Sequence, residues 1–402
     1  MSSRPRVLFL VNSLPAAGGA EQFVLNQVRR TDRTRFDVSV CQTGGSRVLR
    51  RFFEDLDVSV YDLEKWVGAD LRSLSRLVKI LRQRSVDILQ AHIPYSVILA
   101  RLAGRLCRGV VVVCTEQGMH YQYRAMTKTA LDLTIGMCDA NVFISRACFD
   151  ATAARHPFLR ASLPIIIPNG IDTGPLGSIA AARRSEARRE LGLAPGDIAF
   201  GNVARLHAVK GQSTLVRAFA EVRSRLARAR LFIAGRGPLE SELRSLVEKT
   251  GMSNAVVFLG ERTDVPRLLG AFDVYVHPGR VEALGVAVLE AMAAGLPTIA
   301  AAVDALPEFV REGETGWLVP PDDMEALAHR MVQVGSRLDA ARSIAARGQA
   351  RVRREYDIGS SVDAYEALYD ELLAARESSL GSLKARRDRQ DSRHGAPVAP
   401  LR

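Results

Sequence analysis

Two glutamates, Glu282 and Glu290, are the residues of this sequence with the clearest potential for chemistry. Glu290 is the only charged residue between positions 283 and 303, and a carboxylate in such apolar surroundings is costly unless a partner binds it. Glu282 stands eight positions earlier, just before a helical pattern over 284–294, where free backbone N–H groups and a positive dipole end are expected. Two carboxylates beside such a helix start suit a polyhydroxylated ligand that bears phosphate. Taken singly, each glutamate could equally be a capping residue or a member of a structural ion pair.

Two cations, Arg205 and Lys210, follow a predicted strand over 199–204 and precede a helix that starts at Gln212. A strand end beside a helix start is where a diphosphate would sit, and two cations can offset its charge without a metal. The alternative is a pair of ordinary surface cations.

Turns that contain glycine follow three predicted strands. Gly18 and Gly19 come after the apolar run 6–11 and open a helix to about Arg30, a geometry that lets a phosphate or substrate approach the backbone. The turn Gly235-Arg236-Gly237-Pro238 lacks the third glycine of the dinucleotide fingerprint, so it is poor evidence for NAD. The loop after the strand 256–259 carries Glu261, a candidate contact to a nucleobase.

Polar residues also follow the predicted strands 86–90 and 110–114. They are His92, Glu116, Gln117 and His120. Ligands of open α/β sheets bind beyond the carboxyl ends of the strands, so these residues are candidates to line one cleft. Each could instead be a structural hydrogen-bonding residue.

Strand and helix patterns alternate along the whole chain, which predicts doubly wound parallel sheets. We expect two domains, over residues 1–175 and 176–356, with a linker that enters a new helix near Pro175. A last helix is expected over about 357–378, and the polar, Arg-rich tail 379–402 is expected to be disordered.

The composition, 47% hydrophobic and 25% charged, is that of a soluble globular protein. The five cysteines are scattered without metal-ligand spacing, which favours reduced thiols in a cytoplasmic protein. The apolar run after Arg6 is too short for a signal peptide, and no run approaches the roughly 18 residues of a membrane span. The string Asp55-Leu56-Asp57 does not follow an apolar strand, so we do not expect a metal site there.

Positive charge is concentrated in the first half of the chain. Residues 1–175 hold 23 Lys and Arg against 15 Asp and Glu, a net +8, whereas residues 176–378 hold 26 against 27, a net −1, and the tail adds +4. This asymmetry indicates an anionic partner for the first half, with nucleic acid or an acidic membrane surface as candidates. A predicted helix over 71–84, apolar on one face and Arg-rich elsewhere, could rest on anionic lipid. A solvated basic surface is the alternative for both observations.

Five motifs, in this order, resemble those of family 4 retaining glycosyltransferases of the GT-B fold. They are Gly-Gly-Ala-Glu at 18–21, Ile-Pro-Asn-Gly-Ile-Asp at 167–172, Arg205 with Lys210-Gly211, Ala-Gly-Arg-Gly-Pro at 234–238, and the Glu-x7-Glu segment 282–290. The resemblance covers about residues 5–375. It implies two Rossmann-like domains that face each other across a cleft, with the acceptor on the first and a nucleotide-sugar on the second, and a last helix that crosses back to the first domain.

The resemblance also implies roles for individual residues. Arg205 and Lys210 would bind the donor diphosphate, Glu290 the ribose hydroxyls, and Glu282 the transferred sugar. The backbone of Ala283, Leu284 and Gly285 would touch the sugar, while Gly18 and Gly19 would approach the diphosphate. We expect Glu282, Arg205 and Lys210 to act in catalysis, with no metal and no cofactor.

The sequence departs from the family pattern at two places. Many members carry a His where Gln117 stands here, so His92 or His120 is expected to supply that group, unless the role is absent. Ala283-Leu284 replaces the more usual Gly-Phe, which would alter the choice of sugar.

These features predict a cytoplasmic glycosyltransferase, of the hexosyltransferase type, that retains the donor's anomeric configuration. Its donor would be a nucleotide-sugar, UDP-linked in preference to GDP-linked, and its acceptor a lipid-linked or cell-surface glycan precursor at the inner face of the membrane. One alternative is a transferase with a small-molecule acceptor. Another is a protein that binds sugar or nucleotide without catalysis, and binding to nucleic acid is not expected.

Overall fold

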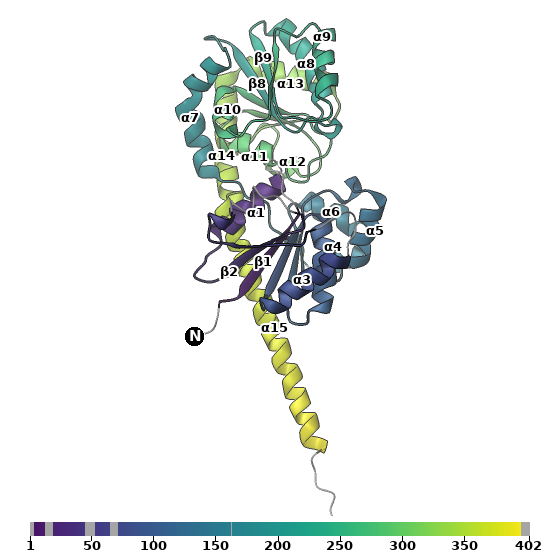
Figure 1. Ribbon diagram of the computed structural model, residues 1–402. Helices are drawn as coiled ribbons and strands as arrows, with labels where there is room; N and C mark the ends of the chain where they lie inside the picture. The colour runs from purple at the N-terminus through teal and green to yellow at the C-terminus, as the bar shows by residue number, and fades with distance from the viewer. Residues whose placement is uncertain (1–3, 13–18, 45–52, 65–70, 162, 395–402) are drawn as a thin grey trace, which may run out of the picture.

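The computed structural model describes residues 4–12, 19–44, 53–64, 71–161 and 163–394. Gly18, a predicted donor-binding residue, therefore lies outside the described part of the chain. The described residues form two α/β domains stacked end to end, with a long C-terminal helix that runs from the second domain along the first (Figure 1).

The first domain contains a parallel sheet of seven strands in the order β3-β2-β1-β4-β5-β6-β7. The central strands β1, β4 and β5 are short, mostly apolar runs that are buried on both faces, as expected for a sheet covered by helices, whereas the edge strands β3 and β7 are half-buried. The strands are β1 (Arg6–Val11), β2 (Asp37–Gln42), β3 (Ser59–Asp62), β4 (Ile88–His92), β5 (Val111–Glu116), β6 (Ala140–Phe143) and β7 (Ile165–Ile166).

Helices cover both faces of this sheet. The helices of the first domain are α1 (Gly19–Arg30), α3 (Leu71–Gln83), α4 (Pro94–Leu106), α5 (Ala125–Thr134) and α6 (Arg146–Ala153), with 3₁₀ turns η1 (His120–Gln122) and η2 (Pro157–Ala161). One core cluster joins α3, α4 and α5 to the side chains of Leu8 and Leu10. The opposite cluster joins α1 and the C-terminal helix to Val7 and Phe9.

The second domain repeats the architecture with six parallel strands in the order β10-β9-β8-β11-β12-β13. They are β8 (Ile198–Val203), β9 (Ala229–Ala234), β10 (Val256–Gly260), β11 (Val274–His277), β12 (Thr298–Ala301) and β13 (Trp317–Val319). The helices are α7 (Thr173–Glu190), α8 (Gln212–Arg225), α9 (Glu240–Lys249), α10 (Val265–Ala271), α11 (Val286–Ala293), α12 (Leu306–Phe309), α13 (Met324–Gly335) and α14 (Leu338–Glu355), with the 3₁₀ turn η3 (Ala208–Lys210). The predicted doubly wound fold is thus confirmed in both halves.

The predicted linker near Pro175 is helical instead. α7 begins at Thr173, so Pro175 and Gly177 lie within its first turns. Proline is tolerated there because the first N–H groups of a helix have no partner within the helix. Further along, Arg184 and Arg188 bind the buried carboxylate of Asp273 at 2.5 and 2.9 Å, which ties α7 to the amino end of the central strand β11.

The last helix, α15 (Ile358–His394), continues past the predicted end near residue 378. The prediction that the tail is disordered from residue 379 onward is therefore wrong as far as His394, where the chain is helical. Residues 395–402 lie outside the described part of the chain. The stretch 379–394 contains four Arg, two Leu and one each of Lys, Ala and Gln, all good helix formers, and no proline, so its backbone has the propensity to extend the helix.

α15 returns the chain to the first domain. Ile358, Val362, Tyr365 and Tyr369 belong to the core cluster of that domain, beside α1.

No helix within the described residues is long and apolar enough to cross a membrane.

Candidate functional site

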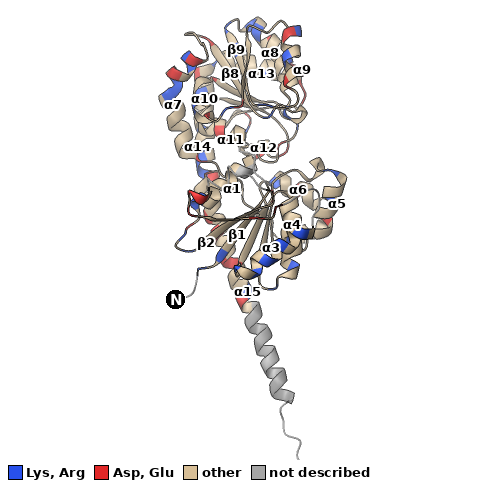
Figure 2. Cartoon of the chain, in the orientation of Figure 1, with Lys and Arg blue, Asp and Glu red and all other residues tan. Residues whose placement is uncertain are grey.

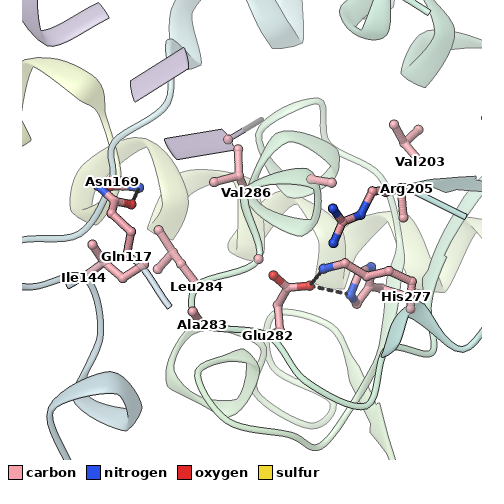
Figure 3. Close-up of a pocket in the computed structure, with 15 residues that line it drawn as sticks. Gln117, Ile144, Asn169, Val203, Arg205, His277, Glu282, Ala283, Leu284 and Val286 are labelled. Carbon is pink, nitrogen blue, oxygen red and sulfur yellow. Dashed lines mark hydrogen bonds and ion pairs between the residues drawn. The ribbon is translucent and has the colours of Figure 1, made fainter. Parts of the chain in front are cut away.

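A cavity of about 270 Å³ lies where the carboxyl ends of the strands of both sheets face each other. The first domain lines it with Gly19, Gln117, Ile144 and Asn169. The second domain lines it with Val203, Ala204, Arg205, Lys210, His277, Glu282, Ala283, Leu284, Gly285, Val286 and Ala287. Figure 3 shows these side chains, with Glu282 and Arg205 facing the open space and Gln117 and Asn169 on the opposite wall.

Glu282 is the centre of charge in this cavity. Its Oε2 lies 2.5 Å from Lys210 Nζ and 3.0 Å from His277 Nε2 (Figure 3). Burial alone would raise the pKa of Glu282, but the hydrogen bond to His277 and the charge of Lys210 outweigh it and lower this pKa to about 2. The Glu282 side chain is therefore ionised at neutral pH and is a weak base, suited to accept hydrogen bonds rather than to transfer protons.

Backbone geometry brings the two cations to the cavity. Gly211, in the left-handed region at φ 68°, lets the turn after Lys210 approach the strand exit closely, since an added Cβ would lie 2.1 Å from the carbonyl oxygen of Pro278. Gln212 Nε2 donates to the carbonyl of Arg205 at 3.0 Å and holds the loop. Arg205 and Lys210 thus both line the cavity, in the loop between the end of β8 and the start of α8.

The N-terminus of α11 supplies backbone donors to the same cavity. Gly285, at φ 92°, is its N-cap and no side chain caps it, while Val286 and Ala287 of the first turn line the cavity. Unpaired N–H groups and the positive dipole end favour an anion at this point. Cations, helix terminus and carboxylate together provide what a phosphorylated, hydroxyl-rich ligand requires.

Glu290 lies one turn further along α11 and does not line the cavity. It is half-buried, and its carboxylate has no hydrogen bond or ion pair within the described part of the chain. Burial raises the pKa of Glu290 to about 7. A ligand with hydroxyl groups would supply the missing partners.

Gln117 of the first domain lines the cavity, whereas the two predicted histidines, His92 and His120, do not. His92 is fully buried behind it, with Nδ1 3.0 Å from Gln117 Nε2 and Nε2 2.9 Å from Gln90 Nε2. Burial lowers the pKa of His92 to about 3, so the imidazole is neutral. Asn169 pairs with the Gln117 amide, Nδ2 to Oε1 at 2.5 Å. The structure therefore makes His92 a support for Gln117.

His120, Glu116 and Glu261 lie outside the cavity. His120 contacts Asp132, which also binds His156 and Arg155, in a separate cluster of ion pairs. Glu116 pairs with the buried Arg101 at 2.9 Å. Glu261 is exposed and does not line the cavity. Of the four polar residues expected to share one cleft, only Gln117 reaches it, because strand ends place the backbone there but side chains alternate between the two faces.

His277 and Asn169 are pocket residues that sequence reasoning missed. His277 ends the central strand β11, and the rule on strand ends that selected His92 would also have selected it. Asn169 belongs to the motif 167–172, and its approach to Gln117 depends on tertiary structure. Groups of three or more potential metal ligands do not occur among the described residues.

Comparisons with known proteins agree with this geometry. The family model described as "Glycosyl transferases group 1" matches residues 183–351, and the model "Glycosyltransferase Family 4" matches residues 17–174. The N-acetyl-alpha-D-glucosaminyl L-malate synthase of Bacillus anthracis is 23% identical over 80% of this chain and 84% of its own length. The UDP-Gal:alpha-D-GlcNAc-diphosphoundecaprenol alpha-1,3-galactosyltransferase of Escherichia coli is 25% identical over 90% and 96%.

Among solved structures, HepE of Anabaena in complex with UDP and glucose superposes with a TM-score of 0.80 at 22% identity, over 92% of this chain and all of that chain. The two facing parallel-sheet domains are those of the GT-B fold. The chain belongs to the group 1 glycosyltransferases of family 4 and is a glycosyltransferase.

Proposed function

We propose that the protein transfers a sugar from a nucleotide-sugar, a UDP-sugar in preference to a GDP-sugar, to a lipid-linked or cell-surface glycan precursor. The observation that carries the proposal is the cavity in which Glu282, held by Lys210 and His277, faces Arg205 and the N-terminus of α11. Further support comes from similar proteins, since the Escherichia coli relative is named for UDP-Gal as its donor and the HepE structure contains UDP and glucose.

The charges of the cavity suit departure of a nucleoside diphosphate. As the bond between the sugar C1 and the diphosphate oxygen breaks, negative charge grows on the phosphate and positive charge on C1. Arg205, Lys210 and the amides of Val286 and Ala287 stabilise the former, and the ionised Glu282 accepts from a sugar hydroxyl beside C1. In this proposal Glu290 accepts from the ribose hydroxyls.

We further propose that the transfer retains configuration and needs no metal. The acceptor oxygen bonds to C1 on the face that the diphosphate leaves, and the acceptor proton passes to a phosphate oxygen. Glu282, with a pKa of about 2 and a cation on its Oε2, is a poor nucleophile and a poor base, which supports this route over a covalent intermediate. NMR of the product anomer tests retention, and unchanged turnover in excess chelator tests metal independence.

Donor binding is the first experiment. We expect thermal stabilisation by one class of UDP-, GDP- or ADP-sugar, because a ligand of the native state raises its stability. The shift should weaken in Glu290→Ala and persist in Glu242→Ala, an exposed carboxylate on α9. No shift with any donor would overturn the proposal and favour a protein that does not catalyse transfer.

The proposed acceptor site is a second cavity, of about 400 Å³, in the first domain. It is lined by Asn12, Pro94, Tyr95, Ile98, Gln122, Tyr123, Arg124 and Thr127. Aromatic rings and amides suit the faces and hydroxyls of a sugar, and Arg124 suits a phosphate. The short segment 117–123 lies between this cavity and the first one, so the proposed donor and acceptor are neighbours.

A lipid-linked acceptor requires the protein to reach a membrane. Figure 2 shows basic residues over α3 and α4 on the outside of the first domain. The exposed face of the layer α3-α4-α5 also carries apolar side chains, namely Leu71, Leu102, Leu106, Met126 and Leu133. Mixed apolar and basic faces bind anionic lipid surfaces. We expect binding to vesicles with anionic lipid and little to neutral ones, weakened in Arg72→Glu with Arg82→Glu; equal binding to both vesicles would remove this support.

A small-molecule acceptor is the second candidate, favoured by the malate named for the Bacillus anthracis relative. In that case turnover would proceed with a soluble acceptor, and vesicles would have no effect on it. Turnover that needs an acceptor embedded in vesicles would exclude this candidate.

A further inference from the structure

Three polar contacts from the first domain converge on one segment of the second domain, residues 282–308. Tyr121 Oη donates to the carboxylate of Asp304, 2.9 Å from each oxygen. Ser145 Oγ donates to the carbonyl oxygen of Ala283 at 2.6 Å. The third contact is the carboxylate of Glu308, which accepts the backbone N–H groups of residues 146 and 147 at 3.1 and 2.8 Å.

Local structure orients each of these contacts. Ser145 is the N-cap of α6, and its Oγ accepts the N–H of Cys148 at 3.1 Å, so its own proton is free to point at Ala283. Glu308 lies on the free N–H groups at the start of the same helix, where a negative charge is stabilised. Asp304 adopts φ 42°, an uncommon conformation outside glycine, and this turns its carboxylate toward Tyr121.

Asp304 also connects the first domain to Glu282. Its Oδ2 accepts the backbone N–H of Glu282 at 2.9 Å, and the carbonyl of Glu282 accepts from the N–H of Ala305 at 3.3 Å. Ser145 donates to the carbonyl of the next residue, Ala283. The backbone N–H and C=O of Glu282 and the C=O of Ala283 therefore all have fixed partners, which orients the Glu282 side chain.

Apolar packing reinforces this arrangement. Leu284 is buried in one core cluster with Met119 and Phe143 of the first domain, so this core crosses the domain boundary. Ile144 belongs to the same cluster, and Figure 3 shows Ile144 and Leu284 on the same side of the cavity. Residues 282–284 therefore owe their conformation to both domains.

We propose that Tyr121, Ser145 and Glu308 are positioning residues, through which the first domain sets the conformation of Glu282 to Gly285 and so completes the site only when the two domains meet. The inference rests on the proposed function, in which Glu282 accepts a hydrogen bond from the transferred sugar. It adds three residues that are not among those that line the cavity.

Hydrogen–deuterium exchange of the full-length protein tests the positioning without any substrate. In Tyr121→Phe and Ser145→Ala we expect peptides that cover 279–290 to exchange several-fold faster. The first variant frees Asp304, the partner of the Glu282 N–H, from Tyr121, and the second removes the donor to the carbonyl of Ala283. Peptides that cover β9 should not change. Matched controls are Tyr61→Phe on β3 and Ser178→Ala on α7, which lie outside these contacts. Unchanged exchange at 279–290, or a rise throughout the chain, would overturn the proposal.

Kinetics with the donor class that stabilises the protein tests the consequence for transfer. We expect kcat for release of the nucleoside diphosphate to fall at least about tenfold in Tyr121→Phe, since small misplacements of a catalytic group are costly. The donor KM and the affinity for the free nucleoside diphosphate should stay within about twofold, and Glu308→Gln, which keeps an acceptor oxygen, should lose less than Glu308→Ala. An unchanged kcat beside faster exchange would overturn the role in transfer. If the wild-type protein binds no donor, the proposed function is overturned, and the role of these residues in transfer with it. This result differs from unchanged hydrogen–deuterium exchange at 279–290, which would overturn the positioning alone.

Discussion

The two glutamates of the Glu-x7-Glu segment differ in protonation, and the cause is their surroundings. Lys210 and His277 keep Glu282 ionised, whereas Glu290 has no such neighbour and its pKa rises to about 7 through burial. The sequence shows both as carboxylates in an apolar stretch, and only the partners distinguish them.

At the residue scale, Glu290 makes stability depend on pH. Because its pKa is raised in the folded state, the folded chain binds more protons than the unfolded chain between about pH 4.5 and 7, so this group destabilises the fold as pH rises through that window. We expect Glu290→Gln to gain about 2 kcal/mol relative to the wild type at pH 8, and to lose most of this gain at pH 5. Urea unfolding at both pH values measures it, and Glu242→Gln serves as the control. A difference that does not change with pH would show that Glu290 is not desolvated.

Arg205 leads to a prediction about phosphate. We expect Arg205→Ala to weaken UDP binding by about 10- to 100-fold, the range of one charge-assisted hydrogen bond. Affinity for uridine, which has no phosphate, should not change. Calorimetric titration of both ligands decides, with Arg217→Ala on the exposed side of α8 as the matched variant. Equal losses for UDP and uridine would place Arg205 away from the diphosphate.

At the scale of elements, α7 and α10 pack through a glycine. A Cβ added at Gly270 would lie 2.3 Å from the carbonyl oxygen of Ala180, so the two backbones approach closely. We expect Gly270→Ala to destabilise the protein by about 1–3 kcal/mol through overpacking. Gly136→Ala, where nothing lies within 4 Å, should be nearly neutral, and thermal unfolding compares the two. Similar melting temperatures for both variants would mean that α7 and α10 can separate without cost.

At the scale of the whole molecule, α15 holds the first domain together although it follows the second in sequence. Val362, Tyr365 and Tyr369 are buried against α1 and the sheet. Tyr365→Ala should cost about 3–5 kcal/mol, as expected for removal of a buried aromatic ring, and Glu371→Ala on the exposed side should cost little.

Truncation extends this prediction. A chain that ends at residue 378 should keep the melting temperature of the full chain, because it retains the core residues Val362, Tyr365 and Tyr369 of α15. A chain that ends at residue 357 should not fold its first domain, and circular dichroism with proteolysis would show this. A stably folded first domain in the shorter chain would contradict the role assigned to α15.

The sequence by itself determined the alternation of strands and helices and the strand ends at which the main cavity residues lie, although it misjudged the start of α7 and the end of α15. The buried strands are continuous apolar runs bounded by glycine, proline and polar residues, a pattern that needs no tertiary information. The main cavity residues of the second domain follow strand ends or precede helix starts. The sequence therefore predicts that they lie at the carboxyl ends of the strands of the second sheet, and the structure places Arg205, Lys210 and residues 282–285 there.

Only the tertiary structure decided which side chains of the first domain reach the cavity. His92 follows a strand end, as expected, yet it is buried and supports Gln117, while His120 turns to Asp132. The contacts of Tyr121 and Ser145 with the segment 282–308 join residues more than 130 positions apart, and no local pattern encodes such pairs. Local propensity indicates which segments form strands and helices, whereas the way two domains face each other depends on packing summed over both. These residues could therefore be identified only from the structure.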